Sequence, residues 1–77
     1  MVLSVKEAYR IVKENDKHNA FNPSMAAENQ VHIAFGNDDN IIRGVNKFTG
    51  EYFQTYFLDY PYQAEDIIRR WDRKEFM

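Results

Sequence analysis

The first apolar residues of the chain recur every three or four positions, which is the spacing of one face of a helix. They are Val5, Ala8, Tyr9, Ile11 and Val12. Ser4 followed by Glu7 is a capping-box sequence, in which each side chain can bind the other residue's free backbone amide. The pattern predicts a helix over residues 5–14, which ends in a polar break over residues 15–19.

Alternating apolar and polar positions follow, and this period of two is typical of strands with one buried face. The alternation is clearest at Val31, Ile33 and Phe35. We predict three strands, over residues 30–35, 41–47 and 51–58, with Gly44 as either a bulge or a point of close approach. Residues 36–40 are a turn by composition, and residues 48–50 are a hairpin loop whose glycine takes the left-handed conformation.

The third strand is an interpretation, because the aromatic residues after Gly50 also fit a helical stripe. Aromatic residues and threonine favour the pleated surface of a sheet. A helix here would have no strong cap at its start, and Pro61 begins a better helix only a few residues later. These points favour a strand, and the helical alternative stays open at this stage.

The end of the chain has the pattern of a second helix, over residues 61–74. Its apolar stripe consists of Ala64, Ile67, Ile68 and Trp71. Glu65 with Arg69, and Asp66 with Arg70, are acid-before-base pairs four residues apart, which stabilise helices. Residues 22–27 fit either one helical turn after Pro23 or a loop. The expected fold is α+β, a three-stranded antiparallel sheet with both helices on one face, in a single domain of residues 1–77.

Alternation along the third strand assigns its side chains to two faces. Phe53, Thr55 and Phe57 share the face expected to be buried under the helices. The open face would then carry Tyr52, Gln54, Tyr56 and Leu58. Tyrosine is enriched at the centres of protein interfaces, so we predict partner binding by a group of residues on or near this face. The group is Tyr52, Tyr56, Tyr60 and Arg43. In the alternative interpretation the tyrosines fill a thin core, and residues 20–25 cover the sheet.

Composition narrows the classes of function. The chain has 77 residues, enough for one domain, and no cysteine, which excludes disulfides and zinc–thiolate sites. Its net charge is −2, so it lacks the basic excess of most nucleic-acid-binding proteins. Aromatic residues on a sheet beside Arg43 and Lys47 keep single-stranded nucleic-acid binding as an alternative. Without a signal peptide or a long apolar run, we expect a cytoplasmic protein with no membrane contact.

Catalytic and metal-binding patterns are missing from the sequence. Asp38 and Asp39 lack the ligand spacing of a calcium loop, and His18 and His32 show no paired spacing for a metal. An enzyme alternative would use His32 with a carboxylate such as Glu51 or Asp59. A domain this small rarely encloses a pocket of several hundred cubic ångströms. We therefore expect a non-catalytic protein without metal or cofactor.

The segment Lys47-Phe48-Thr49-Gly50-Glu51 resembles the Lys-x-Thr-Gly-Glu turns that join strands in several small bacterial domains, including PepSY-like domains. Those domains are associated with peptidase inhibition, so the resemblance implies inhibitory binding. It covers five residues of 77, and no family is assigned from it. The expected function is a small protein-interaction or regulatory module that uses the tyrosine-bearing face or a free sheet edge, with an inhibitor or immunity role or a homodimer included.

Overall fold

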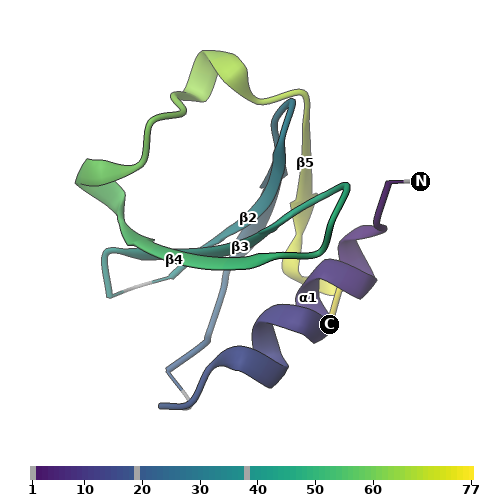
Figure 1. Ribbon diagram of the computed structural model, residues 1–77, viewed down its shortest axis with the longest axis vertical. Helices are drawn as coiled ribbons and strands as arrows, with labels where there is room; N and C mark the ends of the chain where they lie inside the picture. The colour runs from purple at the N-terminus through teal and green to yellow at the C-terminus, as the bar shows by residue number, and fades with distance from the viewer. Residues whose placement is uncertain (1, 19, 38) are drawn as a thin grey trace.

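The computed structural model describes residues 2–18, 20–37 and 39–77, which form a helix on one side of an antiparallel sheet (Figure 1). The helix and strands are α1 (Val5–Asn15), β1 (Met25–Glu28), β2 (His32–Gly36), β3 (Ile41–Asn46), β4 (Tyr52–Tyr56) and β5 (Arg69–Asp72). The strand order across the sheet is β4-β3-β2-β1-β5, and every neighbouring pair is antiparallel. Residues 57–68, here called the crossover, connect β4 to β5 over the face opposite α1 (Figure 1).

The predicted amino-terminal helix is confirmed. The Ser4 hydroxyl accepts from the Glu7 amide at 3.2 Å, and the Glu7 carboxylate accepts from the Ser4 amide at 3.0 Å. Both bonds satisfy amides that have no partner within the helix. The apolar stripe of α1 packs on β3 and β4. The core consists of Val5, Ala8, Val12, Ala26, Ile33, Phe35, Val45 and Phe76. The polar break after α1 includes residue 19, which lies outside the described residues.

The hairpin between β3 and β4 is also confirmed, and with it the interpretation of the third segment as a strand. Gly50 has a φ of 77°, in the left-handed region. The Asn46 side chain accepts from the amides of Phe48 and Thr49 at 2.9 and 3.1 Å and so fixes the turn. Strand β4 ends at Tyr56, and the chain then enters a short 3-10 turn, η1 (Phe57–Asp59).

The predicted helix over residues 61–74 is wrong. This segment contains η2 (Ala64–Asp66), strand β5 and η3 (Arg73–Glu75) instead. Each acid–base pair would stabilise a helix by only about 0.2–0.5 kcal/mol. Pairing β5 with β1 satisfies the backbone groups at that edge of the sheet, and it brings Trp71 and Phe76 against the core. Tertiary contacts thus outweigh the local helical preference.

The predicted three-stranded sheet is too small, because β1 and β5 extend it to five strands. Residues 22–27 were expected to form a helical turn or a loop, and residues 25–28 form β1. Ala26 and Ala27 alternate between the two faces of the sheet, but two alanines carry little strand signal. The turn between β2 and β3 includes residue 38, which lies outside the described residues.

The two faces of β4 are reversed relative to the prediction. Tyr52 lies opposite Val45, a core residue, so Tyr52, Gln54 and Tyr56 share the face that α1 covers. Phe53 and Thr55 lie on the opposite face, beneath the crossover. Alternation correctly separated the two sets of side chains. It could not decide which set faces the helix, because that depends on the packing of distant elements.

Candidate functional site

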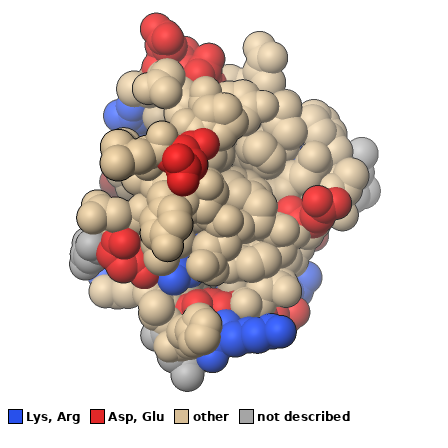
Figure 2. All heavy atoms as spheres, turned by 60° about the vertical axis from the view of Figure 1, so that its left-hand side comes forward, with Lys and Arg blue, Asp and Glu red and all other residues tan. Residues whose placement is uncertain are grey.

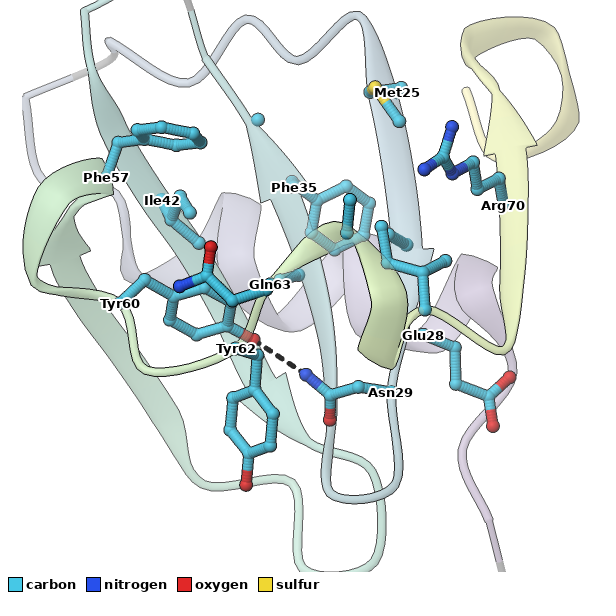
Figure 3. Close-up of a pocket in the computed structure, with 15 residues that line it drawn as sticks. Met25, Glu28, Asn29, Phe35, Ile42, Phe57, Tyr60, Tyr62, Gln63 and Arg70 are labelled. Atoms are coloured by element: carbon cyan, nitrogen blue, oxygen red, sulfur yellow. Dashed lines mark hydrogen bonds between the residues drawn. The ribbon is translucent and has the colours of Figure 1, made fainter.

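The crossover does not lie flat on the sheet but leaves a cleft between the two (Figure 3). The cleft has a volume of about 330 Å³ and is open to solvent on one side. Its floor includes Ala27, Ala34 and Ile42, and the crossover contributes Phe57, Tyr60 and Ile67 to its walls. Ligand-binding clefts in proteins begin at roughly 300 Å³. The sequence led us to expect no enclosed pocket of this size, and the structure has an open cleft instead.

The cleft exists because one row of side chains across the sheet is short at its centre. The strand register aligns Arg70, Ala27, Ala34, Gly44 and Phe53 in this order on the face beneath the crossover. A methyl group added at Gly44 would lie 2.9 Å from the Phe53 ring, so Gly44 is a point of close approach, as predicted. In the next row, a methyl group at Gly36 would meet no atom within 4 Å. These alanines and glycines thus leave space between the sheet and the crossover.

Tyr60 holds the crossover against the sheet. Its hydroxyl accepts from the Asn29 side-chain amide at 2.9 Å (Figure 3), and its ring stacks on Phe53 with 5.8 Å between centroids. The Asn29 side-chain oxygen Oδ1 accepts from the backbone amides of Val31 and His32, so the turn between β1 and β2 holds the Asn29 side chain in place. Burial raises the pKa of Tyr60 to about 12, so the hydroxyl stays neutral at physiological pH.

Charged groups lie at the margin of the cleft. The Glu28 carboxylate pairs with Lys47 Nζ at 2.7 Å and is therefore already satisfied. Arg70 lines the cleft from β5 (Figure 3), and no carboxylate of the described residues lies within ion-pair distance of it. The Gln63 side chain adds an amide from the crossover. The interior is thus mainly apolar, with polar groups at its margin.

The four residues that the sequence suggested for partner binding do not lie together. Tyr60 lines the cleft, whereas Tyr52 packs against the core on the other side of the sheet. Tyr56 is 65% exposed near the end of β4. Arg43 is buried, and its guanidinium lies 3.1 Å from the Asp39 carboxylate and 3.8 Å from Asp16. The prediction of one tyrosine-bearing open face is therefore wrong in its geometry.

The residues that form the floor of the cleft, Ala27, Ala34 and Gly36, were not among those predicted from the sequence. A signal was present, because Ala34 and Gly36 occupy alternate positions on the face of β2 away from the core. Two small residues at such positions leave space above a sheet. Only the path of the crossover shows that this space becomes a cleft.

His32 lies next to Tyr60 of the cleft wall, in ring contact with Phe53, Tyr60 and Tyr62. Its Nδ1 is 3.4 Å from the Tyr60 hydroxyl, a long hydrogen bond. Among the described residues no hydrogen bond joins His32 to Glu51, Asp59 or another carboxylate. The geometry is that of a packed aromatic ring beside the cleft.

We expect the stability of the protein to depend on the ionisation of His32. Burial lowers the pKa of His32 below its ordinary value of 6.5. The unfolded chain therefore binds the proton more tightly, and the free energy of unfolding should fall as the pH drops from 6.5 through the lower pKa of the folded state. Urea unfolding at pH 5 to 8 measures this effect.

His32→Gln should reduce that pH dependence. His18→Gln, which replaces an exposed histidine, is the control for the loss of an imidazole elsewhere in the chain. Equal pH profiles for the wild type and His32→Gln would contradict the assignment.

In the part of the chain that the structure describes, no helix is both long and apolar enough to cross a membrane. Within residues 2–18, 20–37 and 39–77, no group of three or more histidine and acidic side chains could hold a metal ion. No protein-family model matches the chain, and no curated protein and no solved structure matches it either.

Proposed function

We propose that this protein is a small, non-catalytic interaction module that binds a protein partner through the cleft beneath the crossover. The partner inserts an apolar side chain between the crossover and the alanine floor. The observation that carries this proposal is the coincidence of an open apolar cleft with a group of exposed apolar side chains around it. Contiguous exposed apolar surface on a small protein is typical of interaction sites.

Exposed apolar side chains are concentrated on this side of the described structure. Those in the cleft or on the crossover are Met25, Phe57, Leu58 and Ile68. Leu58 is 92% exposed and Phe57 is 65% exposed. Figure 2 brings the side with β4 and η1 toward the viewer, and most of the surface there is uncharged, with single charged residues scattered over it. An apolar centre with sparse charges is the composition of interface cores.

The alternative of single-stranded nucleic-acid binding has less support. The two cations expected beside the aromatic strand are Arg43 and Lys47, and each is buried in an ion pair with an acidic side chain. Neither guanidinium nor ammonium group is free to neutralise a phosphate. An inhibitory or immunity-type role is one form of the proposed protein binding.

Filling the cleft should abolish partner binding. We expect a random-peptide display library to yield peptides with an apolar anchor that bind the wild type, and we expect Gly36→Leu to weaken their binding at least tenfold. Gly36 lacks a positive φ, and a side chain added there enters open space, so the variant should fold. Calorimetry with the selected peptides measures the affinity.

Two phenylalanines of similar exposure provide a matched control. Phe57→Ser removes an exposed ring at the cleft, and Phe48→Ser removes an exposed ring in the hairpin turn. We expect only Phe57→Ser to reduce peptide affinity, by roughly five- to thirtyfold for a loss of about 1–2 kcal/mol at an interface hot spot. If no peptide is enriched, or if Gly36→Leu binds as the wild type does, the proposal is rejected.

A further inference from the structure

The two edge strands of the sheet, β4 and β5, are protected to different degrees. An edge strand presents unpaired backbone groups, and proteins usually guard it with charged side chains, proline or a bulge. Strand β5 carries Arg69, Arg70 and Asp72 within four residues. Strand β4, with the sequence Tyr-Phe-Gln-Thr-Tyr, has neither a charged residue nor a proline. The β4 edge is therefore open to another strand.

The register of the hairpin shows which backbone groups of β4 are free. The Asn46 amide donates to the Glu51 carbonyl at 2.9 Å, and the Phe57 amide donates to the Asn40 carbonyl at 2.8 Å. Hydrogen-bonded positions alternate in an antiparallel ladder, so the odd-numbered residues of this strand face β3. The N–H and C=O groups of Tyr52, Gln54 and Tyr56 face outward. Among the described residues, none of these groups has a hydrogen-bond partner.

We propose that the β4 edge binds the β4 edge of a second copy of this chain, forming a symmetric dimer with one continuous sheet. The two-fold axis passes beside Gln54, so that Tyr52 of each copy lies opposite Tyr56 of the other. In this register every outward-facing residue meets an outward-facing residue, which allows six backbone hydrogen bonds. A shift by two residues in either direction would leave some of these groups unpaired.

Side chains on both sides of the axis are self-complementary. Tyr52, Gln54 and Tyr56 lie on the same face of β4, so the dimer places one Tyr56 beside the partner copy's Tyr52. The Gln54 amide has both donors and acceptors, and it can pair with its own symmetry mate. Tyr56 is 65% exposed at the end of this edge, and a second copy gives its ring a surface on which to be buried.

This dimer and the proposed cleft function are distinguishable, because they use different surfaces. The cleft lies over β1, β2 and β3, whereas the dimer uses the outer edge of β4. Gly36→Leu should therefore lose peptide binding and remain a dimer. A variant with a blocked β4 edge should become monomeric and still bind peptides.

Light scattering across a concentration series tests the dimer. We expect a wild-type mass of twice the 9.2 kDa of one chain. Gln54→Pro should give a monomer, because proline removes an outward amide without breaking the ladder to β3. Gln54→Lys should also dissociate the dimer by placing two like charges at the axis. Circular dichroism and urea unfolding verify that each variant is folded. If Gln54→Pro does not fold, Gln54→Lys alone tests the dimer.

A single introduced cysteine tests the register, because the native chain has none. Opposed hydrogen-bonded residues in an antiparallel pair have Cα atoms about 5.5 Å apart, which suits a disulfide. We expect Gln54→Cys to form covalent dimers on mild oxidation, and Arg70→Cys, on the β5 edge, to remain uncrosslinked. A monomer mass at every concentration overturns the proposal. So does a dimer that persists in folded Gln54→Lys, or crosslinking at residue 70 rather than residue 54.

Discussion

We expect Phe35→Ala to lower the free energy of unfolding by about 3–5 kcal/mol, as large-to-small changes of buried phenylalanine do. Phe35 is fully buried, and its ring contacts Tyr9, Phe21 and Phe76, so its removal leaves a cavity between α1 and the sheet. A chain of this length has roughly 4–12 kcal/mol of stability in total. The substitution therefore removes a large fraction of the total stability. Urea titration monitored by circular dichroism measures the change.

Phe57→Ala is the matched control for this prediction. The Phe57 ring is 65% exposed, so its truncation should change stability by no more than about 0.5 kcal/mol. Phe35→Leu, which fills part of the space, should lie between the two. Similar unfolding midpoints for Phe35→Ala and Phe57→Ala would contradict the core assignment.

Arg43→Met should be the second strongly destabilising change, by about 3–5 kcal/mol, because it breaks a buried ion pair and leaves one charge alone. The Arg43 and Asp16 side chains are 3% and 4% exposed. Without Arg43, the Asp16 carboxylate stays buried with the Phe21 amide as its hydrogen-bond donor. Chemical denaturation at neutral pH measures the loss.

A second substitution separates the buried charge from lost packing. Arg43→Met with Asp16→Asn removes the charge and keeps an oxygen acceptor for the Phe21 amide, so this double variant should recover part of the lost stability. Asp39→Asn is the control for the more exposed partner, and it should cost no more than about 1 kcal/mol. If Arg43→Met loses no more stability than Asp39→Asn, the buried pair of Arg43 and Asp16 does not contribute the predicted free energy of unfolding.

The example of Arg43 shows why only part of the candidate site was predictable. In the sequence this residue sits on an alternating strand beside aromatic residues, which suggested a surface cation. Its burial depends on Asp16, 27 positions earlier, and on the side of the sheet that α1 covers. Tyr60 was predicted from the sequence as a partner-binding residue, and its position in the cleft wall depends on Asn29 from a distant turn.

Local chemistry determined the parts of the fold that the sequence predicted. The capping box of Ser4 and Glu7, the glycine at position 50 and the alternation along β2 and β3 involve residues a few positions apart. These contacts are local, so the sequence predicted helix α1 and favoured the β3–β4 hairpin without information from distant segments. The absence of cysteine likewise excluded thiol chemistry without any structure.

Tertiary structure decided the remainder. Residues 69–72 have a helical pattern, yet they form β5, because β1 offers unpaired backbone groups and the core accepts Trp71 and Phe76. The same long-range packing decided which face of β4 meets α1, and it carried the crossover over a floor of small residues to form the cleft. Strand pairing and burial between distant segments contribute more free energy than local propensity. The two segments that pair, such as β1 and β5, are far apart in the chain, so no short stretch of sequence contains both.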